Sequence, residues 1–312
     1  MEIPFKFYPV ASSWVAFHPK PKGIFVFIGG TFYGSFSTLF YQYLLKQLFA
    51  EGYTIIVLPF RFTWRHWSVA LSLLREQQIL RDRIPKILKD SGFEDEECKV
   101  YLENKNYIWL GHSLGCKYIA LLEFLANWKQ NSPEVHDRIR SSLSNSEAQI
   151  AEIERQIAGI DVSLKDQYSI LLAPEISGTE AAIPIPQLSD LIDRLNLGVQ
   201  PTPEDTFSLI KNSPLFNLTG LISFRCDGSI AGTKDDKILR NTDGTINRKT
   251  NTVPWLREVK PQLQEFYREI EGGHLRPLGL RLGDQVFGQI AAPPNNLVPT
   301  VLHLLDCLRK DR

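Results

Sequence analysis

Short apolar runs recur along this chain, and they predict strands that are buried on both faces of a sheet. The run GIFVFIGG at residues 23–30 is continuous, consists largely of β-branched and aromatic residues and ends in paired glycines, as expected for such a strand. Further strands are predicted at residues 53–60, 107–110, 169–175 and 221–227, and in the stretch FYREIEGGH that ends at His274.

Helical patterns separate these strands. The first, at residues 37–52, has apolar residues at helical spacing and Gly52 as its stop. Others cover residues 68–89, with a kink expected at Pro85, residues 117–128, and the segments VPWLREVKPQLQ and PTVLHLLDCLRK. This alternation predicts an α/β fold with a mostly parallel central sheet flanked by helices. Near the N-terminus, FKFYPV and SWVAF predict an antiparallel edge.

We expect a single domain over residues 1–312, because 312 residues, 43% of them hydrophobic, are enough to bury one large core. Two segments interrupt its alternation of strands and helices. Residues 131–166 are polar and charged, with Ile150, Ile153 and Ile157 on one stripe, and predict an inserted helix. We favour a solvated surface excursion over a lid or a helix that docks a protein partner. Residues 176–218 include a proline-rich stretch and predict a cap region.

The charge balance argues against a nucleic-acid binder. Thirty-five Lys and Arg residues match thirty-five Asp and Glu residues, so no global field draws the chain to nucleic acid or to an anionic membrane. The four cysteines show no close pairing motif, which is typical of a reducing compartment. No signal peptide and no transmembrane segment is evident. We therefore expect a soluble, cytoplasmic protein.

A serine lies between two glycines where a predicted buried strand meets a predicted helix. The sequence GHSLG places Ser113 between Gly111 and Gly115. A sharp strand-to-helix turn projects a nucleophile out of the fold, and its flanking residues must lack side chains because strand and helix approach closely. The pattern Gly-x-Ser-x-Gly alone is weak evidence for a nucleophile. Its position between a predicted strand and a predicted helix favours such a nucleophile elbow over an ordinary turn. We expect His112 to be a packing residue.

Backbone amides near this serine are candidates for an oxyanion hole. The elbow aims the N–H of Leu114, at a helix N-terminus, toward an oxygen that becomes negative on an attacked carbonyl. A second donor is expected after the first central strand, where Ile28-Gly29-Gly30-Thr31-Phe32 follows. Thr31 and Phe32 are the candidates. Neither phosphate-binding glycine pattern is present here.

The general base is expected after the last strand, because the fold orders its triad as Ser, acid, His. Among the six histidines, His274 fits this place, directly after Gly272-Gly273. For the acid, Asp227 ends an unbroken apolar strand and is preferred. Asp235 and Asp236, in a similar loop, remain alternatives. An ionised carboxylate there fixes the imidazole tautomer and stabilises the imidazolium.

Six segments resemble one family. They are FIGGTFYGS, LPFRFTWRHW, GHSLGCKY, PTPEDT, LISFRCD and GGHLRP, and together they are similar to α/β-hydrolase-like proteins of photosynthetic organisms, catalogued as domain of unknown function thirteen-fifty. The resemblance implies an α/β-hydrolase fold with Ser113, Asp227 and His274 at the triad positions, and it implies no substrate. The chain departs from the family at Arg65, where an Asp is expected, and at Cys226, where a second acid is common.

These observations favour a serine hydrolase of esters or thioesters that works through an acyl-enzyme. Phe62, Trp64, His66 and Trp67 follow the second central strand and are candidates for binding the small-molecule substrate. The chemistry needs no cofactor, and His and Cys spacing shows no metal site. Acyl transfer on the same triad is an alternative, as are a cofactor-free haloperoxidase or lyase and a non-catalytic scaffold that binds a protein or small molecule.

Overall fold

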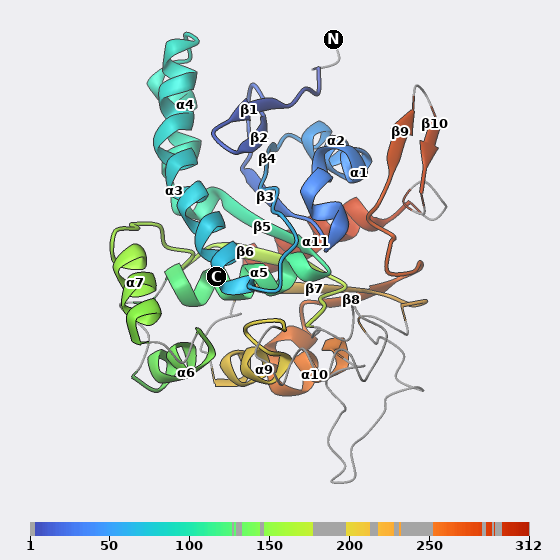
Figure 1. Cartoon of the computed structure of the whole chain (residues 1–312). Coiled ribbons are helices and arrows are strands. Elements are labelled where there is room, and N and C mark those ends of the chain that lie inside the picture. The colour runs from blue at the N-terminus through green and yellow to red at the C-terminus, as the bar shows by residue number, and fades with distance from the viewer. Residues whose placement is uncertain are drawn as a thin grey trace.

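Eight strands form one mostly parallel sheet in the computed structural model of this chain (Figure 1). Their order across the sheet is β1-β2-β4-β3-β5-β6-β7-β8. The structure describes residues 4–126, 128, 133–143, 147–176, 198–212, 218–227, 231, 252–282, 285–288, 290 and 295–311.

The five central strands are buried along their whole length. They are β4 (Thr54–Val57), β3 (Ile24–Ile28), β5 (Tyr107–His112), β6 (Tyr168–Leu172) and β7 (Thr219–Phe224). Their neighbours pair in parallel, so the predicted strands that are buried on both faces are confirmed.

The two edges of the sheet differ. At one edge, β1 (Tyr8–Val10) and β2 (Ser13–Ala16) form an antiparallel hairpin, and β2 pairs antiparallel with β4, which confirms the predicted antiparallel edge. At the other edge, β8 (Tyr267–Ile270) pairs in parallel with β7 and is only partly buried.

Helices cover both faces of the sheet (Figure 1). On one face, α3 (His66–Asp90) packs against α5 (Leu114–Ala126), and on the other α11 (Leu297–Lys310) packs against α2 (Gln42–Ala50) and the strands β6 to β8. This layering and strand order are those of the α/β-hydrolase fold, as predicted. Within the described part of the chain, no helix has both the length and the apolar character to cross a bilayer.

The helix predicted at residues 37–52 is interrupted. The structure has a 3₁₀ helix η1 (Phe32–Phe36), then α1 (Ser37–Phe40) and α2, with a break at Tyr41. The Tyr41 side chain is fully buried, and its hydroxyl makes two hydrogen bonds near Ser113, so tertiary contacts outweigh local helix propensity there. By contrast, α3 continues through Pro85 to Asp90 as one helix.

The segment at residues 131–166, where an inserted helix was predicted, holds two helices, α6 (Pro133–Leu143) and α7 (Glu147–Ala158). Of the predicted cap, residues 177–197 and 213–217 lie outside the described part. Its described part contains α9 (Pro203–Asn212), which packs against α6 and, through Phe207 and Trp255 at 4.3 Å between ring centroids, against α10 (Thr252–Val259).

The helix predicted over VPWLREVKPQLQ is divided into α10, which ends at Val259, and the 3₁₀ helix η6 (Pro261–Gln264). Several other short elements were not predicted from the sequence. They are α4 (Asp95–Leu102), η2 (Asn104–Asn106) and a two-stranded hairpin of β9 (Leu280–Leu282) and β10 (Gln285–Phe287). These segments are too short to show a clear period of apolar residues.

Candidate active site

Ser113 occupies a tight turn between β5 and α5. Its backbone has a positive φ of 54°, a region that non-glycine residues rarely adopt. The neighbouring strand β6 holds this turn in place, because the N–H of Ser113 donates a hydrogen bond to the carbonyl of Leu172 at 3.0 Å. A Cβ atom on Gly115 would overlap the backbone carbonyl oxygen of Ile28. Glycine is therefore required where α5 passes the end of β3.

Three predicted side chains meet at this turn. The Oγ atom of Ser113 lies 2.9 Å from Nε2 of His274, and Nδ1 of His274 lies 2.6 Å from Oδ2 of Asp227. Both distances are those of hydrogen bonds. The three residues come from the ends of β5, β7 and β8, which lie at the carboxyl edge of one sheet. An acid, an imidazole and a hydroxyl are thus connected in the order that nucleophilic catalysis requires.

Asp227 is buried in the core. It is 1% exposed, and its Oδ1 accepts a hydrogen bond from the N–H of Ala231 at 3.3 Å. The preceding residue, Cys226, donates its N–H to the carbonyl of Gly272 at 2.8 Å, which joins this loop to the loop that carries His274. The alternative acids Asp235 and Asp236 lie outside the described residues.

The predicted oxyanion donors lie on the β3 side of Ser113. A Cβ atom on Gly30 would be 3.1 Å from Cβ of Ser113, so the loop after β3 passes directly over the serine. The N–H of Gly30 donates to the hydroxyl of Tyr41 at 2.8 Å. The next amides, those of Thr31 and Phe32, follow at once, and Leu114 provides the first amide of α5. The first amides of a helix have no partner within that helix.

A buried hydrogen-bond chain connects the three loops around the serine. The Tyr41 hydroxyl lies 2.7 Å from Nδ1 of His112, and Nε2 of His112 lies 2.9 Å from the backbone carbonyl oxygen of His274. Tyr41 is fully buried and His112 is 1% exposed. The chain therefore runs from the Gly30 amide, through two side chains, to the backbone of His274. We refer to it as the Tyr41–His112 chain.

The partners of the Tyr41–His112 chain determine its proton positions. The carbonyl of His274 can only accept, so Nε2 of His112 carries the proton and Nδ1 accepts from the Tyr41 hydroxyl. The same hydroxyl oxygen accepts the N–H of Gly30. Burial, followed by the nearby His274, lowers the pKa of His112 to about 3. His112 is thus neutral near pH 7 and is a packed, hydrogen-bonded residue, not a base.

A second carboxylate touches the serine. The Oε2 atom of Glu175 lies 2.7 Å from Oγ of Ser113, and the N–H of Glu175 donates to the carbonyl of Ser113 at 3.3 Å. Glu175 follows β6 in a turn where Ala173 has a φ of 44°. Its side chain is half-buried. Glu175 was not among the predicted site residues, although its position directly after a buried strand indicates that it lies at the carboxyl edge of the sheet.

The four candidate substrate-binding residues divide into two pairs. Phe62 and Trp64 are half-buried, with ring centroids 5.2 Å apart, and Phe62 lies 5.3 Å from the ring of Phe32, which is 66% exposed. His66 and Trp67 are 2% and 4% exposed. These two side chains belong to the interior at the start of α3.

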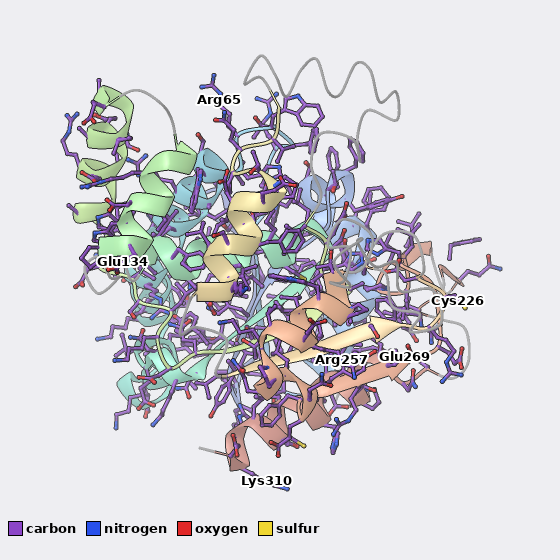
Figure 2. All side chains as sticks on the ribbon, turned by 90° about the horizontal axis from the view of Figure 1, so that it is seen from below. Arg65, Glu134, Cys226, Arg257, Glu269 and Lys310 are labelled. Carbon is purple, nitrogen blue, oxygen red and sulfur yellow. The ribbon has the colours of Figure 1, made fainter. Side chains whose placement is uncertain are left out.

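Burial has the largest effect on the pKa of His66. Desolvation, with a smaller contribution from the charge of Lys117, lowers its pKa. Its ring packs edge-on against Tyr118, with centroids 5.4 Å apart. The preceding residue, Arg65, is exposed and points away from the body of the molecule (Figure 2). Neighbouring residues on this loop therefore face opposite environments.

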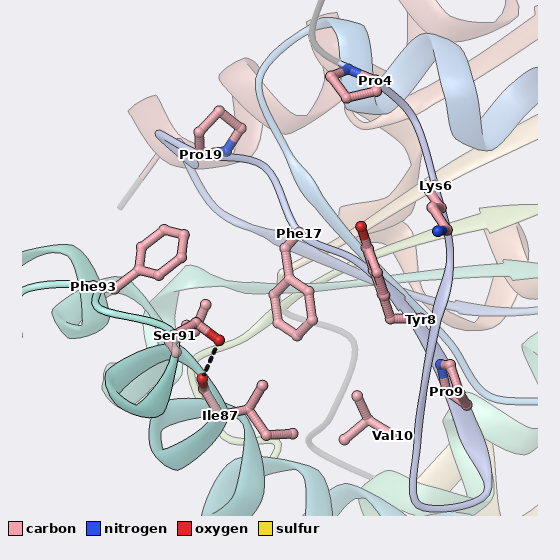
Figure 3. Close-up of a pocket in the computed structure, with 11 residues that line it drawn as sticks. Pro4, Lys6, Tyr8, Pro9, Val10, Phe17, Pro19, Ile87, Ser91 and Phe93 are labelled. Atoms are coloured by element: carbon pink, nitrogen blue, oxygen red, sulfur yellow. Dashed lines mark hydrogen bonds between the residues drawn. The ribbon is translucent and has the colours of Figure 1, made fainter.

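A separate apolar pocket of about 770 Å³ lies elsewhere (Figure 3). The N-terminal segment and the end of α3 line it, with Tyr8, Phe17 and Phe93 among the lining residues. Since α3 begins after the carboxyl end of β4 and returns along the sheet, its last turns lie at the opposite edge from Ser113. This pocket shares no lining residue with the candidate active site.

Part of the chain matches a protein family of unknown function. Residues 6–132 match the model of a family described as "Protein of unknown function (DUF1350)", a range that includes Ser113 but neither Asp227 nor His274. No match was found among proteins with curated descriptions.

Solved structures to which this chain is similar include proteins described as esterases. A propionate-bound thermophilic esterase from Thermogutta terrifontis is 12% identical, with 99% of this chain and 92% of that chain covered and a TM-score of 0.45. A putative carboxylesterase from Lactobacillus plantarum is 12% identical, with 99% and 98% covered and a TM-score of 0.48. A sugar hydrolase from Lactococcus lactis is 13% identical, with 99% of both chains covered and a TM-score of 0.48.

Proposed function

We propose that this chain is a serine hydrolase that cleaves a carboxylic ester or thioester through an acyl-enzyme. The observation that carries the proposal is the connection of Ser113, His274 and Asp227 by hydrogen bonds of 2.9 and 2.6 Å at a turn where Ser113 has a positive φ. This combination of strained turn and connected side chains is what an activated serine needs.

Acylation begins with proton transfer from Ser113. The O–H bond of Ser113 breaks as its proton moves to Nε2 of His274, and Oγ forms a bond to the carbonyl carbon of the substrate. The carbonyl π electrons move to the oxygen, which the amides of Leu114 and of Thr31 or Phe32 stabilise. When the tetrahedral intermediate collapses, the carbon–oxygen or carbon–sulfur bond to the leaving group breaks, and His274 donates its proton to that group.

Deacylation repeats these steps with water. His274 takes a proton from water as the hydroxide oxygen attacks the acyl carbon, and the proton then returns to Oγ of Ser113 as the carboxylic acid leaves. Asp227 accepts a hydrogen bond from Nδ1–H of His274 throughout, so it fixes the tautomer and stabilises the imidazolium. The exposed ring of Phe32 and the half-buried rings of Phe62 and Trp64 provide an apolar surface for part of the substrate.

Labelling with a fluorophosphonate probe tests this proposal. We expect covalent labelling of the wild-type protein and none of Ser113→Ala, because the probe reacts with an activated serine hydroxyl. The rates of hydrolysis of p-nitrophenyl esters of graded acyl length would then show which acyl length the apolar surface accommodates best. Absence of labelling in a folded wild-type protein would contradict the proposal and favour a non-catalytic scaffold.

A further inference from the structure

Glu175 and the candidate oxyanion donors lie on opposite sides of Ser113. β5, which ends directly before Ser113, pairs with β3 on one side and with β6 on the other. The oxyanion candidates Thr31 and Phe32 follow β3, whereas Glu175 follows β6. A substrate whose carbonyl oxygen points to the β3 side therefore directs another of its substituents toward the carboxyl group of Glu175.

The hydroxyl of Ser113 cannot donate to both of its neighbours. It has one proton, and it lies 2.9 Å from Nε2 of His274 and 2.7 Å from Oε2 of Glu175. Because Nδ1–H of His274 faces Asp227, Nε2 of the neutral ring is an acceptor. An ionised Glu175 is an acceptor too. When the serine proton turns toward His274 for attack, Glu175 loses the donor that it has in the free protein.

No cation among the residues that the structure describes replaces that donor. Among the described residues, the side chain of Glu175 has no ion pair, and its hydrogen bond goes to Ser113 alone. A partly buried carboxylate that loses its hydrogen-bond donor is destabilised, and this raises the barrier to attack by Ser113. An unsubstituted ester cannot relieve this, because it has no hydrogen-bond donor.

We propose that Glu175 determines specificity by accepting a hydrogen bond from a hydroxyl or ammonium group that the substrate carries next to its scissile bond. The preferred substrates are therefore hydroxy- or amino-substituted esters, which supply the donor that Ser113 withdraws. This inference rests on the proposed function. It assigns Glu175 no part in the transfer of the serine proton, which goes to His274.

Matched substrate pairs test the assignment. Acid release is measured for the methyl esters of propionic acid, lactic acid and alanine, which differ only in a hydrogen, hydroxyl or ammonium on the acyl side. Propyl propionate and 2-hydroxypropyl propionate form the corresponding pair on the alcohol side. We expect a kcat/KM ratio of about 10- to 100-fold in favour of the substituted ester in at least one series, the range for hydrogen bonds to a charged group.

Three variants separate charge from hydrogen bonding. Glu175→Ala should reduce the ratio to about one in both series. Glu175→Gln keeps a carbonyl acceptor without charge, so it should retain much of the preference for the hydroxyl and lose that for the ammonium. Glu51→Gln, the same change at an exposed residue after α2, is the matched control and should leave the ratios unchanged. Each ratio compares two substrates on one preparation, so partial misfolding does not alter it.

The outcomes distinguish this inference from the proposed function. If wild-type protein labels at Ser113 and hydrolyses methyl propionate, but Glu175→Ala keeps the wild-type ratios, the assignment of Glu175 is overturned and the hydrolase proposal stands. Equal rates for substituted and unsubstituted esters in the wild type overturn it too. If the wild type neither labels nor turns over any ester, both fall.

Discussion

Replacing Tyr41 with Phe removes one oxygen atom from the centre of the Tyr41–His112 chain. That oxygen accepts the N–H of Gly30 at 2.8 Å and donates to Nδ1 of His112 at 2.7 Å. Tyr41 is fully buried, His112 is 1% exposed and Gly30 is buried as well. The substitution keeps the ring and its packing, so its effect reports on the two hydrogen bonds.

The magnitude follows from the two groups that lose their partner. A buried donor or acceptor left without a hydrogen bond costs about 1–3 kcal/mol, and both the Gly30 amide and Nδ1 of His112 are left so. Removing the buried hydroxyl offsets part of this, and we expect the free energy of unfolding to fall by about 2–4 kcal/mol. Since the chain also positions the backbone of His274, kcat should fall by about tenfold with little change in KM.

Urea unfolding and ester hydrolysis measure the two effects. The midpoint should shift without a change in slope, and the loss in kcat should be the same from about pH 5 to 9, because the low pKa of His112 keeps its ring neutral throughout. Tyr43→Phe is the control, since Tyr43 is half-buried and, within the described part of the chain, its hydroxyl accepts a single exposed hydrogen bond, from Asn295 at 3.2 Å. A Tyr41→Phe protein within about 0.5 kcal/mol of wild type, with unchanged kcat, would refute this reasoning.

Three further changes have defined outcomes. Asp227→Asn should lower kcat by about 10⁴-fold while the fold persists, because an amide can present its NH₂ to Nδ1 and favour the wrong tautomer of the imidazole; unchanged turnover would exclude Asp227 as the acid. Gly115→Ala should lower the free energy of unfolding by about 3 kcal/mol or more in urea titrations, since its Cβ overlaps the carbonyl of Ile28; a neutral effect would contradict the close approach. Burial raises the pKa of Glu123 to about 8, with the charge of Lys260 opposing the shift, so the folded state binds this proton more tightly than the unfolded state and stability falls as pH rises from about 4.5 to 8. In Glu123→Gln this part of the pH dependence of the thermal midpoint should vanish, and a curve parallel to that of wild type would count against the shift.

Local sequence patterns were sufficient for the sheet and for the serine turn. The apolar runs that became β3, β5 and β7 are buried along their whole length, because only strands covered on both faces need such runs. The pattern GHSLG was likewise sufficient to predict the sharp turn, in which Gly115 lies close to the end of β3 and Ser113 adopts a positive φ. In each case the information lies within a few consecutive residues.

Long-range contacts decided what surrounds the serine. Tyr41 falls inside a predicted helix, and its role appears only when β3 and β5 lie side by side. The sequence pattern places Glu175 at the end of a predicted strand, whereas the pairing of β6 with β5 brings its carboxyl group to Ser113. Hydrogen bonds between residues 62 or more positions apart depend on strand order and on the turns after each strand, which apolar periodicity does not specify. A linear pattern therefore identifies the elements and the nucleophile candidate, whereas the partners of that nucleophile are set by the packing of the sheet.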